Sequence, residues 1–208
     1  YEWLAFLRVM KSVRQLFWMT ALVAVLCTWP SAVAAAQPVL TDVKGKQHAP
    51  FKSEKTKAVV FVFMLRDCPV SNVYAPELTR IHKEYTAKGV ALYLVHPDRD
   101  TNAKSAIAHA KEYKLNAPVV LDHDHKLTRL AEAEVTPEAA VFDAKGRLVY
   151  RGRIDNLYAD FGKKRFKPTK RDLRDTLDAL LAGKRLAKRT TEAVGCYIDF
   201  SNDKNEDK

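Results

Sequence analysis

Residues 58–71 read AVVFVFMLRDCPVS, and this stretch decides the fold. Its first eight residues are all apolar and rich in β-branched and aromatic side chains, a pattern typical of a strand that is buried on both faces. Helical spacing of apolar residues begins after Pro69 and extends to residue 88. Proline is favoured in the first turn of a helix. The stretch therefore predicts a strand, a tight loop and a helix, with Cys68 at the junction.

The segments on either side alternate between strand and helix patterns. A short hairpin is expected within 39–51, and Pro76 is expected to kink or interrupt the first helix. The helix at 101–115 is expected to be amphipathic, with Ile107, Ala110 and Tyr113 on one face and Asp100 or Thr101 as its cap. The remaining expected elements are strands at 90–95 and 119–121, a short helix at 126–133, a hairpin of strands at 139–142 and 148–150, and a helix at 172–182. This order predicts an α/β domain with one mixed central sheet, flanked by helices in three layers.

The chain has 208 residues and a formal net charge of +10, with 47% hydrophobic residues. This composition excludes a chain that is disordered throughout. The densest basic run, 163–174, contains seven Lys and Arg residues but only Phe166 as an aromatic residue, and no nucleic-acid motif. We interpret the run as a solvated basic face and expect no nucleic-acid partner.

The first 36 residues have the three parts of a signal peptide. Lys11 and Arg14 precede an apolar run at 16–29, and the small residues of 31–36 offer cleavage sites after Ala34 or Ala36. The run is shorter than the roughly 20 residues that span a bilayer. We expect a periplasmic or secreted protein with a folded domain at 39–183 and an extension at 184–208. The alternative is an uncleaved anchor, which is the only membrane contact that the sequence predicts.

Cys68 stands where a thiolate is favoured. It precedes the first turn of a helix, where free N–H groups and the helix dipole stabilise negative charge, and Arg66 is near in sequence. A thiolate attacks disulfides and binds soft metals. The alternative is a buried cysteine that acts as a small hydrophobic residue.

Three features together resemble a known family. They are the apolar strand that leads into Asp67-Cys68-Pro69-Val70-Ser71, the pair Thr136-Pro137 before a strand, and the hairpin at 141–152. The chain resembles the thioredoxin-like superfamily, in its redoxin or thiol–disulfide oxidoreductase branch, which is AhpC/TSA-like. The resemblance implies that Cys68 is the nucleophilic thiol. It also implies that Pro137 is a cis-proline beside Cys68 and that Thr136 presents its backbone to an extended substrate.

The sequence departs from the family patterns at three positions. Ser71 replaces the second cysteine of Cys-x-x-Cys, although its hydroxyl could donate a hydrogen bond to the thiolate. Phe61 and Leu65 replace the Pro and Thr/Ser of the peroxiredoxin motif, which argues against peroxide reduction of that type.

Cys196 is the candidate resolving thiol. An extended segment after the last helix could fold back over the domain, and Gly195 permits a close backbone approach. The alternatives are an unpaired cysteine or an intermolecular crosslink. The predicted site comprises Cys68 and Cys196 as reacting residues, supported by Asp67, Pro69, Ser71, Thr136 and Pro137.

Two histidine-containing segments are weaker candidates. His123-Asp124-His125 offers no third converging ligand. His96, where the second strand ends, could lie near Cys68 but is interpreted as a loop residue. We therefore expect no metal site and no cofactor. The predicted function is thiol–disulfide exchange with protein or small-molecule disulfides and thiols. The alternatives are a binding module that holds Cu(I) through thiolates or docks on a redox partner, and a weak thiol peroxidase.

Overall fold

The computed structural model describes residues 38–187 and 189–201. The predicted signal peptide and the last seven residues of the predicted polar tail lie outside the described residues. Within the described part, no helix is long and apolar enough to cross a membrane.

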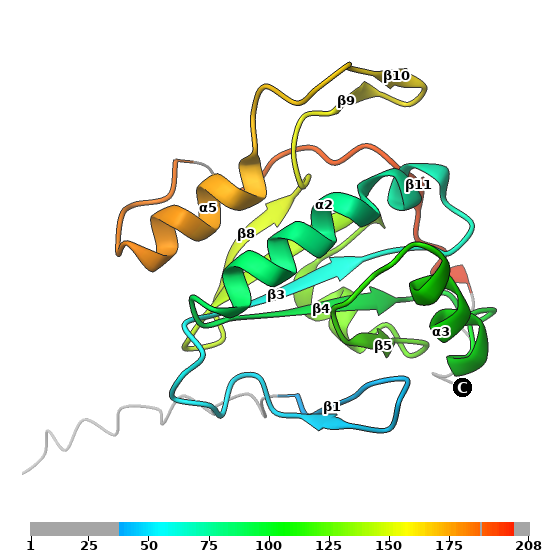
Figure 1. Cartoon of the computed structure of the whole chain (residues 1–208), viewed down its shortest axis with the longest axis horizontal. Coiled ribbons are helices and arrows are strands. Elements are labelled where there is room, and N and C mark those ends of the chain that lie inside the picture. Colours follow the sequence, from blue (N-terminus) through cyan, green and yellow to red (C-terminus); the bar gives the residue numbers. More distant parts are fainter. Residues whose placement is uncertain (1–37, 188, 202–208) are drawn as a thin grey trace, which may run out of the picture. The chain divides into compact units, whose positions relative to one another are not determined.

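A sheet of five strands forms the centre of the domain (Figure 1). Its strand order is β5-β4-β3-β7-β8. The first three strands are parallel, and β7 and β8 are antiparallel additions. The bounds are β3 Ala58–Phe63, β4 Val90–His96, β5 Val119–Leu121, β7 Glu138–Asp143 and β8 Leu148–Gly152. The predicted mixed α/β sheet is confirmed.

The two faces of β3 belong to different halves of the core. Val60 and Val62 pack in the cluster that includes α2 (Pro69–Thr86), α3 (Ala103–Glu112) and α5 (Asp172–Leu181). Val59 and Phe61 pack in the opposite cluster, which includes Leu127 of α4 (Lys126–Ala131). Because side chains alternate along a strand, a continuous apolar run is needed to supply both clusters. The result is the predicted three-layer arrangement.

Three details of the helices correct the sequence predictions. Pro76 does not interrupt α2, whose buried residues continue on both sides of it. Asn102, rather than Asp100 or Thr101, caps α3 through a capping box with Ser105. The buried face of α3 consists of Ala106 and His109, while Ile107 is 41% exposed. The helix is therefore confirmed, but of its predicted face Ala110 packs against the core while Ile107 does not.

Three pairs of short strands lie outside the central sheet. β1 (Leu40–Thr41) pairs with β2 (Gln47–His48), as the predicted N-terminal hairpin requires. β9 (Tyr158–Asp160) pairs with β10 (Lys163–Lys164), a hairpin that the sequence did not predict. β6 (Val135–Thr136) pairs with β11 (Cys196–Tyr197). The third pair joins the C-terminal extension to the domain, so residues 196–197 pack as part of the folded domain.

Candidate functional site

Cys68 lies at the junction that the sequence predicts. It is the N-cap residue of α2, with Pro69 in the first turn. Its backbone N–H donates to the Leu65 carbonyl, and its own carbonyl accepts from Asn72 N–H. These bonds close the loop tightly, and Cys68 is only 1% exposed.

The Thr136–Pro137 loop lies directly beside this thiol. The peptide bond between the two residues is cis. Cys68 Sγ donates to the Thr136 carbonyl oxygen at 3.3 Å. The buried Glu138 carboxylate accepts from Glu134 N–H and Val135 N–H, which holds the chain leading into the loop. The two segments are 68 residues apart in sequence, and the fold brings them into contact.

Cys196 reaches the same place from the C-terminal end of the chain. In the β6–β11 ladder it pairs with Thr136, and Thr136 Oγ1 donates to the Cys196 carbonyl at 3.3 Å. Cys196 Sγ lies 2.6 Å from Cys68 Sγ and donates to it. The expected approach of the two cysteines is therefore present. Cys196 is only half-buried, so its sulfur is the more accessible of the two.

Residues 189–200 form what we call the arm, which is anchored on both sides of Cys196. On one side, Thr191 N–H donates to the Arg151 carbonyl, and Thr191 Oγ1 lies 2.7 Å from the Tyr150 hydroxyl. On the other side, Ile198 is 6% exposed and its N–H donates to the Glu134 carbonyl. The arm is therefore a packed part of the domain that holds Cys196 in place.

Gly195 is required for the close approach of the arm. A Cβ at this position would lie 1.9 Å from the Thr136 carbonyl oxygen and 2.6 Å from the Thr136 carbonyl carbon. Both atoms belong to the backbone and have no side-chain freedom with which to avoid the clash. The sequence argument that a glycine permits the approach agrees with this geometry.

The two thiols differ in acidity. Burial opposes ionisation of Cys68, but hydrogen bonds from Cys196 and Ser71 outweigh it and lower the pKa of Cys68 below its usual value. Burial, the hydrogen bond to Cys68 and the charge on Cys68 raise the pKa of Cys196. Cys68 is therefore the thiol that ionises first and the better leaving group from a disulfide.

The other predicted site residues lie around Cys68 in different ways. The buried Ser71 hydroxyl makes no regular hydrogen bond, yet it is close enough to Cys68 to lower the thiol pKa. Asp67 points into solvent and forms an ion pair with Arg66 at 3.1 Å. Arg66 is therefore engaged by Asp67 rather than by the thiol, whereas the predicted contribution of the helix start is present, because hydrogen bonds from Ser71 lower the pKa of Cys68.

A buried polar cluster behind the loop was missed by sequence reasoning. Asn72 donates to the Arg66 carbonyl at 2.9 Å, and its Oδ1 lies 2.8 Å from His109 Nε2. Burial and nearby positive charges lower the pKa of His109 to about 4. His96, interpreted above as a loop residue, is instead the last residue of β4, fully buried, with its ring 5.5 Å from that of His109. No sequence pattern links Asn72 to His109, since they lie on different helices.

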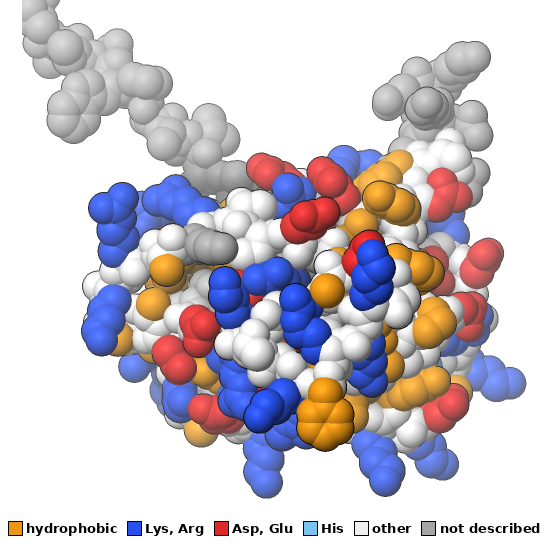
Figure 2. Space-filling view, turned by 90° about the horizontal axis from the view of Figure 1, so that it is seen from above, with side chains coloured by type: hydrophobic (Ala, Val, Ile, Leu, Met, Phe, Trp, Pro, Cys, Tyr) orange, Lys and Arg blue, Asp and Glu red, His pale blue; other side chains and the backbone are white. Residues whose placement is uncertain are grey.

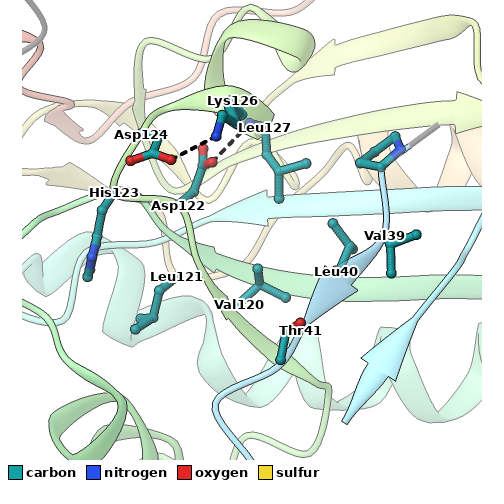
Figure 3. A pocket seen from close by; sticks show the side chains of 11 residues that line it. Val39, Leu40, Thr41, Val120, Leu121, Asp122, His123, Asp124, Lys126 and Leu127 are labelled. Atoms are coloured by element: carbon teal, nitrogen blue, oxygen red, sulfur yellow. Dashed lines mark hydrogen bonds and ion pairs between the residues drawn. The ribbon is translucent and has the colours of Figure 1, made fainter. Parts of the chain in front are cut away.

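His123 and His125 do not converge on a common point. His123 Nε2 bonds the Thr101 carbonyl and His125 Nε2 bonds the Pro97 carbonyl. Both residues are near a pocket of about 390 Å³. Figure 3 shows that Asp124 faces Lys126 in this pocket while His123 points away. Among residues 38–187 and 189–201, no group of three or more His, Cys, Asp or Glu side chains could hold a metal ion. Neither cysteine lines the pocket.

Comparison with known proteins gives a family and a fold. The AhpC/TSA family model matches residues 28–151. A hypothetical protein from Sinorhizobium meliloti is similar in structure, with 26% identity over 79% of this chain and 91% of that chain and a TM-score of 0.68. An uncharacterized conserved protein from Geobacillus kaustophilus has 25% identity over 79% and 90% of the two chains and the same TM-score. No curated protein sequence matches the chain.

Proposed function

The chain belongs to the AhpC/TSA family of thioredoxin-like redoxins, and from this premise we propose that it is an exported thiol–disulfide oxidoreductase. Its reacting groups are Cys68 and Cys196, which form a reversible intramolecular disulfide. The single observation that carries the proposal is the 2.6 Å separation of the two sulfur atoms at the Thr136–Pro137 loop.

The overall reaction is a two-electron exchange. The two thiols lose two electrons and two protons and form one disulfide bond. A partner disulfide gains the same electrons and protons and becomes two thiols. With a partner dithiol the reaction runs in reverse. The partners are protein or small-molecule disulfides and thiols.

The difference in acidity between the thiols orders the steps. The Cys68 thiolate attacks a partner disulfide, forms a mixed disulfide and releases one partner thiolate. Cys196, which gives up its proton, then attacks Cys68 Sγ and releases the second partner thiolate. Because Cys68 is 1% exposed, the first step requires the part of the arm near Cys196 to move aside.

A trapping experiment tests these roles. The Cys196→Ser variant cannot resolve a mixed disulfide, so incubation of the reduced variant with oxidised glutathione should leave a glutathione adduct on Cys68. The Cys68→Ser variant should react more slowly, because burial, the largest cause of the raised pKa of Cys196, remains when Cys68 is replaced. Peptide mapping by mass spectrometry locates the adduct. Equal adduct levels in the wild type and Cys196→Ser would show that Cys196 has no resolving role.

Export of the protein would begin with a signal peptide in the first 36 residues. The basic, apolar and small-residue order of residues 11–36 supports it. N-terminal sequencing of the native protein should find a chain that begins after Ala34 or Ala36. A native chain that still carries residues 16–29 would indicate an anchor.

The peroxidase alternative gains no support from the site. The positions that carry Pro and Thr/Ser in peroxiredoxins hold Phe61, which is fully buried in β3, and Leu65, which packs against the core. Neither side chain can donate a hydrogen bond to a peroxide. For a metal-binding module, Cys68 and Cys196 supply two soft thiols of the kind that Cu(I) prefers, while no group of three or more His, Cys, Asp or Glu side chains among the described residues could hold a metal ion.

A further inference from the structure

The β9–β10 hairpin projects from the domain outside the central sheet (Figure 1). The two strands pair only with each other. Every residue from 159 to 167, the run ADFGKKRFK, is exposed. This hairpin takes no part in the thiol site, so its composition needs a separate explanation.

Two phenylalanine rings on this hairpin face solvent. Phe161 occupies the turn between β9 and β10 and is 65% exposed, and Phe166 is 101% exposed. The remaining phenylalanines of the described residues are buried or half-buried. Single exposed apolar residues are common on protein surfaces. Two exposed aromatic rings close together on one projecting segment indicate a contact with an apolar medium.

The same segment is strongly basic. Six exposed Lys and Arg residues lie within 158–171, namely Lys163, Lys164, Arg165, Lys167, Lys170 and Arg171. Asp160 is the one acidic residue in that range, and Lys163 neutralises it at 3.0 Å. Figure 2 looks down on the side of the domain where Figure 1 places the hairpin, and many Lys and Arg side chains cover it. The hairpin therefore carries a large excess of positive charge.

The base of the hairpin is rigid. The buried Asn156 accepts backbone N–H bonds from Thr169 at 2.8 Å and Lys170 at 2.9 Å. Arg165 N–H donates to the Leu157 carbonyl at 2.7 Å. These bonds hold both ends of the segment, so the rings and charges are presented by an ordered structure.

We propose that residues 158–171 dock the protein on an anionic lipid surface. Phe161 and Phe166 enter the interface between headgroups and acyl chains, and the basic side chains bind headgroup phosphates. The positive charge of the segment could also bind an acidic protein. However, two exposed rings that project from the segment can insert into a lipid bilayer more easily than into the packed surface of a folded protein. The sequence predicted membrane contact only through an uncleaved signal segment, so this surface is a second and independent contact.

Vesicle binding tests the proposal. Residues 37–208 form a compact unit, and they contain no tryptophan. A Phe166→Trp variant of this unit is therefore its own fluorescent probe. It should bind phosphatidylcholine vesicles that contain phosphatidylglycerol, with a blue shift of the emission, and should not bind phosphatidylcholine alone. Added salt should weaken the binding.

Matched variants distinguish the effect of charges on the hairpin from the effect of the net charge of the protein. Each basic residue near such a surface changes binding by about fivefold, so Lys163→Glu with Lys164→Glu should weaken binding well over tenfold. Lys104→Glu with Lys111→Glu makes the same charge change at exposed positions of α3 and should have a much smaller effect. Phe161→Ser with Phe166→Ser should weaken binding, while Ile107→Ser, at another exposed apolar residue, should not.

Three results would overturn the proposal. They are absence of binding to the anionic vesicles, equal losses from the hairpin and α3 charge variants, and binding to polyglutamate without binding to vesicles. The last result would identify an acidic protein as the partner. All variants should have the wild-type midpoint potential of the Cys68–Cys196 pair. An unchanged potential indicates that the variant domain is folded. That potential also separates a failure of this proposal from a failure of the proposed oxidoreductase activity.

Discussion

Gly195→Ala should separate Cys196 from Cys68 without removing either thiol. The new Cβ would lie 1.9 Å from the Thr136 carbonyl oxygen, whereas ordinary contacts begin at 3.4 Å, so the arm must shift by about 1.5 Å. The clashing atoms belong to the backbone of the Thr136–Pro137 loop, whose Thr136 carbonyl also accepts the hydrogen bond from Cys68 Sγ. The shift therefore opens the gap between the sulfur atoms, whose bonding geometry tolerates little displacement.

The effect can be expressed as a midpoint potential. A disulfide needs both sulfur atoms in register, so the shift should weaken disulfide formation at least tenfold. For a two-electron couple, tenfold corresponds to about 30 mV towards less negative values. Loss of the packing of Ile198, which is 6% exposed, should also lower the free energy of unfolding, by about 1–3 kcal/mol. Thiol counting by mass spectrometry in glutathione buffers measures the potential.

Gly183→Ala is the matched control for Gly195→Ala. A Cβ at Gly183 meets no atom within 4 Å, but the backbone φ of +66° is unfavourable for alanine. This control should lower stability by about 1 kcal/mol and leave the potential unchanged. The reasoning is refuted if Gly195→Ala forms the disulfide with the wild-type midpoint.

Three further predictions concern acidity and stability. A pH titration followed by the ultraviolet absorbance of the thiolate should show a Cys68 pKa below the roughly 8.5 of a free cysteine. Cys196→Ala should raise this pKa, because a hydrogen bond to the Cys68 sulfur is lost. An unchanged pKa in the variant would contradict the prediction. Burial opposes ionisation of Asp143, but hydrogen bonds from Arg147 and Lys145 outweigh it and lower the pKa, so the ionised carboxylate stabilises the folded state above pH 3.8 and this stabilisation is lost as the pH falls. Asp143→Asn should therefore lower the free energy of unfolding by about 1 kcal/mol near neutral pH and by less in acid. Urea denaturation measures both values, and a loss that does not depend on pH would refute the prediction. Thr191→Ala removes the bond to the Tyr150 hydroxyl and should cost about 1 kcal/mol, whereas Thr190→Ala, at an exposed neighbour, should cost little in the same assay.

The parts of the fold that depend on local patterns could be predicted from the sequence. The run at 58–65 is apolar on both faces because β3 is the middle strand and supplies both core clusters. The junction at Cys68 follows from Pro69, which favours a first helical turn. In both cases the neighbours along the chain contain the physical cause.

The parts that depend on distant contacts could not be predicted fully. The buried face of α3 is decided by His109, which meets Asn72 and His96, rather than by the hydrophobicity of Ile107. The β9–β10 hairpin lacks an apolar alternation, because neither of its faces is buried. Pro76 stays inside α2 because flanking residues such as Ala75 and Leu78 bury the helix in the core.

The sequence predicts the lowered pKa of Cys68 and one of its causes, the helix start that contributes the Ser71 N–H, but not the larger contribution of Cys196. Arg66, the other predicted cause, bonds Asp67 instead. The sulfur is influenced by Cys196, which is 128 residues away. The sequence could suggest that Cys196 returns to the site, but only the β6–β11 pairing shows how it is held there.

The most direct measurement is disulfide mapping of the wild-type protein across a series of glutathione redox buffers. The account predicts a single two-electron transition, at whose oxidising end a proteolytic digest contains a peptide that joins Cys68 to Cys196. Both cysteines should be alkylated at the reducing end. If Cys68 stays a free thiol throughout, or is recovered only as a glutathione adduct or an intermolecular crosslink, the proposed reversible pair is wrong.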